Sequence, residues 1–188
     1  MRIPFSILTC LVLMTAASNA QRVMTAPETF TANAHVKGPV GAAVAVIQIR
    51  IERYSADHER TAVESALKSG GYPAFLTALR KVEEVGYLTH GGQKYAIRFA
   101  REVKTATGRT IAVVTDKPVF FVGGGAIDAK PRAGYEVAVI QMTMDAAGLG
   151  RGTMAAAARV KPGGETGVQI DDYAVEPIKL EAIMRKIE

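Results

Sequence analysis

The 188-residue sequence has one cysteine, no tryptophan and three histidines. The cysteine, Cys10, lies in an N-terminal apolar stretch that we interpret below as a signal peptide. Once that stretch is removed, the remaining chain has neither a thiol nor a disulfide, so its stability must come from its core. The sequence therefore excludes thiol catalysis and cysteine-ligated metal sites for the mature chain.

The chain also lacks any run of lysine or arginine. Its formal net charge is +5, but the basic residues are scattered and aromatic residues make up only 6% of the sequence. Nucleic-acid-binding surfaces gather basic residues on one face and often combine them with stacking aromatic side chains. We therefore expect no nucleic-acid partner and interpret the positive charges as a solvated surface.

Motifs of serine hydrolases and zinc enzymes are missing as well. The serines beyond the N-terminal stretch are Ser55, Ser65 and Ser69, and none stands in the Gly-x-Ser-x-Gly context of a nucleophile elbow. No two histidines have the i, i+4 spacing of a zinc-binding helix. We expect no metal, no cofactor and no catalytic residue.

One catalytic alternative stays open. A hydrolase or metal-dependent enzyme would need a site assembled in space from His35, His90 and Asp171 or Asp172. The two aspartates follow each other, and successive residues of a strand face opposite ways. They would act together only if the chain bulges at this point.

Residues 1–20 have the layout of a secretory signal peptide. Arg2 supplies a positive charge, residues 4–17 are mostly apolar, and Ser18-Asn19-Ala20 places small residues before a cleavage point. The apolar stretch is short for a membrane span of about 20 residues. We expect cleavage near Ala20, export to the periplasm or the outside of the cell, and no membrane span in the mature chain.

Residues 21–188 predict a single antiparallel α+β domain, a sheet or barrel-like structure of about eight strands. Apolar and polar residues alternate in several segments, and residues 135–160 form the strongest hairpin signal, two apolar arms around a glycine-rich turn. The first half of residues 41–54 is apolar on both faces, which favours deep burial. The tail from Pro177 fits either a strand or a helix, and we favour a strand.

Residues 56–85 depart from this alternation. Apolar residues recur there at helical spacing in two runs, separated by Gly70-Gly71, which predicts a helical hairpin of about residues 56–85. The alanines of residues 155–158 are weak strand formers. We expect them where a bulkier neighbour comes close, and the helical hairpin is the candidate.

Several stretches together resemble those of a group of exported bacterial proteins with a domain of unknown function. They are IQIRIERYSADHER, the Gly-Gly joint, GYEVAVIQMTMD, GRGTMAAAARVK and IDDYAVEPIKL. The resemblance covers nearly the whole mature chain and implies export and one domain. It carries over no activity, ligand or functional residue.

These observations favour a non-catalytic exported binding domain for a small apolar ligand or a cell-envelope protein, bound at the mouth of the sheet or barrel. A structural subunit of an envelope assembly is a further alternative. The sequence assigns no binding residue and leaves the oligomeric state open.

Overall fold

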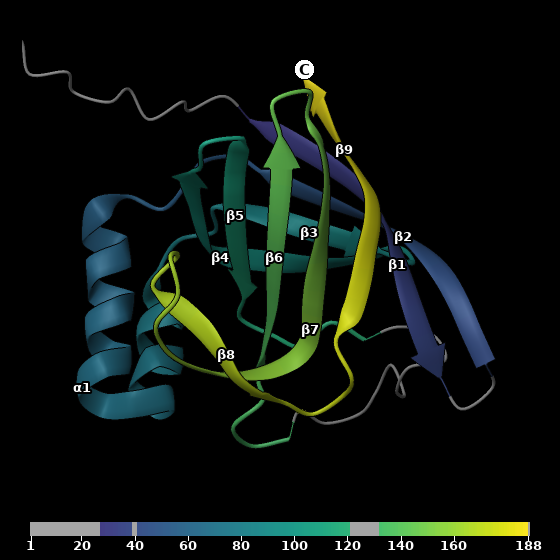
Figure 1. The fold of residues 1–188 in the computed structure, drawn as a ribbon. Coiled ribbons are helices and arrows are strands. Elements are labelled where there is room, and N and C mark those ends of the chain that lie inside the picture. The colour runs from purple at the N-terminus through teal and green to yellow at the C-terminus, as the bar shows by residue number, and fades with distance from the viewer. Residues whose placement is uncertain (1–26, 39–40, 121–131, 188) are drawn as a thin grey trace, which may run out of the picture.

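The structure, a computed structural model, describes residues 27–38, 41–120 and 132–187. The predicted signal peptide, residues 1–20, lies outside the described residues. The described part contains nine strands and one helix (Figure 1): β1 (Glu28–Gly38), β2 (Gly41–Ile51), α1 (Asp57–Lys81), β3 (Gly86–His90), β4 (Gln93–Lys104), β5 (Gly108–Thr115), β6 (Val137–Asp145), β7 (Leu149–Pro162), β8 (Val168–Tyr173) and β9 (Ile178–Ile187).

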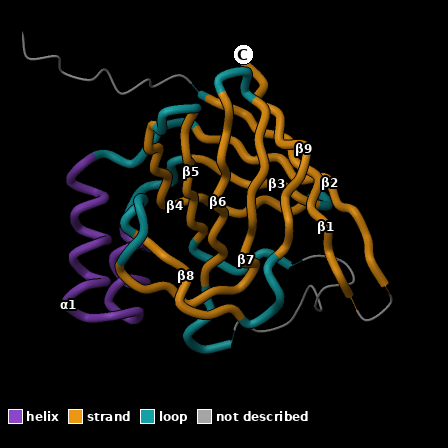
Figure 2. The backbone as a smooth tube through the Cα atoms, viewed as in Figure 1, coloured by secondary structure: helices purple, strands orange, loops and turns teal. Residues whose placement is uncertain are grey.

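Eight of these strands close into an antiparallel barrel (Figure 2). Neighbouring strands follow the order β6-β5-β4-β3-β2-β1-β9-β7, and β6 pairs with β7 to complete the circle. The remaining strand, β8, pairs with β7 outside the barrel. The prediction of an antiparallel, barrel-like α+β domain of about eight strands is confirmed at this level.

The interior of the barrel is a packed core. Because successive side chains of a strand point to opposite faces, every second residue of a barrel strand turns inward. An eight-stranded barrel is just wide enough for such side chains to fill it. Each barrel strand contributes residues that are at most 1% exposed, for example Phe30, Ile49, Leu88, Ile97, Ile111, Ile140, Met154 and Leu180.

The predicted hairpin of residues 135–160 is present as β6 and β7. Strand β7 is 14 residues long, and its two halves have different partners on one edge. Its first half pairs with β9 and its second half with β8, so β7 leaves the barrel as it proceeds. The tail from Ile178 is a strand, as we favoured.

Helix α1 packs on the outer face of the barrel, mainly against β7 and β4 (Figure 1). Its buried face includes Leu67 and Phe75, which share a cluster with Ala155 and Ala158 of β7. The small alanine side chains leave room for the helix, as the sequence predicted. None of the helical residues that the structure describes forms a segment long and apolar enough to cross a membrane.

The finer prediction of two helices is not established. The structure has one helical element over this region, interrupted at Gly71, whose φ of 65° and ψ of −161° are not helical. Glycine tolerates this backbone conformation because it has no Cβ. A helical hairpin over residues 56–85 therefore stays a prediction.

The predicted deep burial of the first half of β2 is wrong. Val44 and Val46 are 60% and 62% exposed. The cause is the register, since β3 pairs with β2 only from Gln48 to Ile51. The preceding residues of β2 extend beyond β3 and, in the described part of the chain, pair only with β1. Apolar residues on both faces of a strand therefore do not distinguish deep burial from an exposed edge.

Candidate binding site at one end of the barrel

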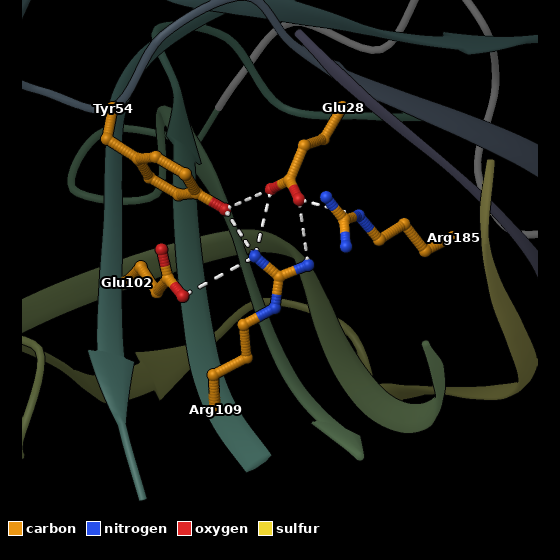
Figure 3. Close-up of polar contacts among 5 residues, drawn as sticks. All are labelled: Glu28, Tyr54, Glu102, Arg109 and Arg185. Atoms are coloured by element: carbon orange, nitrogen blue, oxygen red, sulfur yellow. Dashed lines mark hydrogen bonds and ion pairs between the residues drawn. The ribbon is translucent and has the colours of Figure 1, made fainter. Parts of the chain in front are cut away.

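Five polar side chains, four from different strands and one from the segment after β2, meet at one end of the barrel (Figure 3). Glu28 begins β1, Tyr54 follows β2, Glu102 lies near the end of β4, Arg109 near the start of β5 and Arg185 near the end of β9. These positions coincide because antiparallel neighbours bring the start of one strand to the end of the next. We call these five residues the Glu28 cluster.

Glu28 is the centre of the cluster and only 4% exposed. Its carboxylate accepts two hydrogen bonds from Arg109, at 2.9 and 3.0 Å, and one from the Tyr54 hydroxyl at 2.7 Å. Arg185 Nε lies 2.7 Å from Glu28 Oε1 as an ion pair, but its N–H does not point along a hydrogen bond. Arg109 also donates to Glu102 at 3.4 Å. Two guanidinium groups therefore balance two carboxylates.

The cluster is suited to fixed charges more than to proton transfer. Burial alone would raise the pKa of Glu28, but hydrogen bonds from Arg109 and Tyr54 and the charges of Arg109 and Arg185 lower this pKa below its usual value of 4.5. Burial, together with the hydrogen bond to Glu28, raises the pKa of Tyr54. A general acid or base needs a pKa near the working pH. The cluster instead seals this end of the barrel.

The sequence held a signal for this cluster that our sequence analysis missed. All four charged members stand two residues away from an inward-facing core residue, so strand alternation turns them inward as well. The core neighbours are Phe30 for Glu28, Ala100 for Glu102, Ile111 for Arg109 and Ile183 for Arg185. A charged residue on the apolar face of a strand indicates a buried ion pair.

The opposite end of the barrel contains a pocket of about 270 Å³, which we call the mouth pocket. It lies where β1 ends and where β2 and β9 begin. Its apolar wall includes Val36, Ala43, Val119, Phe120 and Ala156. The volume is close to the lower end of the range of small-molecule sites, about 300–1,000 Å³.

Main-chain hydrogen bonds fix two segments of the pocket to β7. The Val119 N–H donates to the Ala156 carbonyl and the Ala174 N–H to the Ala157 carbonyl, both at 2.9 Å. Residues 175–177, which also line the pocket, follow directly after the second of these bonds. The pocket wall is thus attached to the barrel on the β7 side.

Charged side chains surround the pocket at its rim. His35 Nε2 lies 3.2 Å from a carboxylate oxygen of Glu181, and Lys37 Nζ lies 3.5 Å from Glu176. Lys179 has no hydrogen-bond or ion-pair partner within the described ranges. Among the described residues, the ammonium group of Lys179 therefore lies beside an apolar pocket without an ionic partner.

A more open groove follows α1. Small side chains such as Ala74 and Ala78 line it, and Arg53 and Glu59 form one of its sides. Arg53 donates two hydrogen bonds to Glu59, at 2.6 and 2.7 Å, which lower the pKa of Glu59. Glu59 also accepts the Ala56 N–H at 2.8 Å, at the start of the helix. The Arg53–Glu59 pair thus fixes the first turn of α1.

The residues of the catalytic alternative have different partners. His35 pairs with Glu181 on β9, and the Nδ1 atom of His90 lies 3.4 Å from the Val46 carbonyl oxygen. Asp171 and Asp172 lie on β8 and contact neither histidine in any hydrogen bond or ion pair that the structure records. Among the described residues, no group of three or more histidine, cysteine, aspartate or glutamate side chains could hold a metal ion.

The two aspartates do meet at a bulge. The register of β7 with β8 shifts so that Arg159 is paired with Asp172 and Val160 with Ile170, leaving Asp171 as an extra residue. Arg159 therefore reaches both carboxylates, at 3.1 and 3.8 Å. A hydrogen bond from the Tyr135 hydroxyl lowers the pKa of Asp172. Both aspartates thus belong to an exposed ion-pair group.

Comparison with other proteins adds no assignment: no family model matches the chain, and neither a curated protein nor a solved structure matches it.

Proposed function

We propose that the protein is a non-catalytic binding domain that holds a small, largely apolar ligand in the mouth pocket. The observation that carries this proposal is the pocket itself, whose wall includes Val36, Ala43, Val119 and Phe120. Burying apolar ligand surface against such a wall contributes about 25 cal/mol for each Å² removed from water. The packed interior of the barrel leaves the mouth as the place for a ligand.

The rim supports a more specific ligand class. Lys179 carries a positive charge without a partner in the described residues, whereas Lys37 is paired with Glu176. A ligand with an apolar body and an anionic end would place its charge near this ammonium group. A medium-chain carboxylic acid has this combination of properties.

The hydrolase or metal-dependent alternative gains no support from these contacts. His35 and His90 have separate partners, and Asp171 and Asp172 are neutralised by Arg159 and Lys161.

The test is calorimetric titration of the purified protein with decanoate and with decanol. We expect saturable binding of decanoate and weaker binding of the alcohol. Ala43→Phe, which fills the pocket from an exposed position, should weaken decanoate binding at least about tenfold, or about 1.4 kcal/mol. Lys179→Met should remove the preference for the acid over the alcohol.

The matched control is Ala106→Phe, which adds the same side chain at an exposed position between β4 and β5. It should bind decanoate as the unchanged protein does. The proposal is wrong if neither probe saturates the protein, or if Ala43→Phe binds decanoate unchanged.

A further inference from the structure

In the part of the chain that the structure describes, the first half of β2 is an open strand edge. Strand β3 covers β2 only from Gln48 to Ile51, and Figure 1 shows β2 extending past β3 beside β1. Residues 41–47 are paired on one side with β1 and on the other with no strand of the described chain. Such an edge presents backbone N–H and C=O groups to any extended chain of suitable shape.

The contact of His90 shows which backbone groups point outward. The His90 ring approaches the Val46 carbonyl oxygen from the β3 side, so the backbone groups of Val46 point away from β1. Because backbone direction alternates with a period of two along a strand, Ala42 and Val44 point the same way. Three residues of β2 thus direct their main-chain groups to the open edge.

This edge lacks the features that normally prevent pairing. Natural edges carry charged residues, proline or bulges. Strand β8, the last strand of the sheet, follows that rule, with Asp171 and Asp172 at a bulge. Residues 41–47 have the sequence GAAVAVI, without a charge or a proline, and Val44 and Val46 are the most exposed large apolar side chains described.

We propose that two copies of this chain pair through the open edge of β2, antiparallel and with a two-fold axis at Val44. This register joins outward-pointing residues to outward-pointing residues. Val44 lies opposite its own copy, and Ala42 lies opposite Val46 of the partner subunit, a small residue against a larger one. No charge meets a like charge, so the edge is complementary to itself.

The edge carries no charge that would attract a partner of opposite charge. A second copy fits it because the copy offers the same uncharged, outward-pointing residues in the matching register. Ala42 and Val44 also line the mouth pocket, but the inference rests on the unpaired strand edge and not on ligand binding there. A five-residue edge with two exposed valines buries much less than the roughly 800 Å² per partner of a standard interface. The dimer is therefore weak and depends on protein concentration.

Charge placed on the axis tests the register. Val44→Lys places two ammonium groups directly opposite each other, about 5 Å apart at Cβ, and Val44→Glu does the same with two carboxylates. In sedimentation equilibrium we expect the unchanged protein to dimerise with rising concentration and each variant alone to remain monomeric. An equimolar mixture of the two variants should dimerise again, because lysine then meets glutamate.

The matched control is Met184→Lys, which places the same charge at a residue 54% exposed on β9, a strand paired on both sides. It should dimerise like the unchanged protein. The inference is overturned if the unchanged protein stays monomeric up to about millimolar concentration, near the weak limit of specific association. A mixture that stays monomeric, an equal loss in Met184→Lys, or growth into open-ended fibres also overturns it.

Hydrogen exchange gives a readout that a general loss of solubility would not change. On dimerisation the amides of Ala42, Val44 and Val46 should exchange more slowly, since they point to the new strand. The amides of Ala43 and Ala45 face β1 and should be protected in the monomer already. Equal slowing at all five amides would contradict strand pairing through this edge.

Discussion

The two ends of the barrel are built in opposite ways. At one end, the Glu28 cluster turns charged side chains inward and neutralises them with one another. At the other end, the apolar wall includes small residues such as Ala43 and Ala156, and His35, Lys37 and Lys179 also line the pocket. A buried charge is tolerated only where partners satisfy it, whereas small apolar residues leave space. The Glu28 end therefore contributes to stability, whereas the other end contains the mouth pocket.

The largest change in the free energy of unfolding should follow removal of the charge of Glu28. Glu28→Gln leaves Arg109 and Arg185 partly buried without their carboxylate, and breaking a buried pair in this way costs about 3–5 kcal/mol. We expect this loss in the free energy of unfolding, measured by urea denaturation at pH 7.

The matched control is Glu176→Gln, at the rim of the mouth pocket, where the pair with Lys37 is 70% and 77% exposed. Exposed pairs contribute about 0–1 kcal/mol. If both glutamine variants lose the same stability, the distinction between a sealed end and an open end fails.

Tyr54→Phe removes only the hydroxyl that donates to Glu28, so it should lower the free energy of unfolding by a smaller amount. Hydrogen bonds to charged groups contribute about 1.5–3 kcal/mol, and we expect a loss in that range. Tyr173→Phe, at a tyrosine 47% exposed on β8, should change the unfolding free energy by less than about 0.5 kcal/mol. If the Tyr54→Phe protein is as stable as the Tyr173→Phe protein, the Tyr54 hydroxyl contributes nothing to the stability of the Glu28 cluster.

Mild acid should change the free energy of unfolding least, because only part of the Glu28 population then takes up a proton. The pKa of Glu28 is lower in the folded protein than its usual 4.5, so the unfolded chain binds the proton first. The stabilisation is complete above about pH 4.5 and is lost as the pH falls through the folded pKa. The gap in unfolding free energy between the unchanged protein and Glu28→Gln should therefore narrow from pH 5 to pH 3.

Glu59 and Asp172 also have lowered pKa values, but both proteins contain them, so their contributions cancel in this difference. A gap that stays constant over this range would mean that Glu28 does not carry the acid sensitivity.

Strand positions were predictable because alternation is a local property. The hairpin of β6 and β7 and the strand after Pro177 follow from residues near one another in the sequence. Strand β3 gives a weaker sequence signal, because only five residues, Gly86–His90, form it. The Glu28 cluster could have been predicted from the inward position of Glu28 beside Phe30, but its partners could not, since Arg109 lies 81 residues away.

The sequence by itself determined the alternation that builds the strands, the small side chains against which α1 packs and the inward position of the four charged residues. The tertiary structure decided which strands become neighbours and how far they overlap. That overlap exposes the first half of β2, where the sequence predicted burial, because β3 ends short of it. It also places the ends of β1, β2 and β9 around one pocket, since strand pairing over long sequence separations depends on the closed sheet and not on local preference.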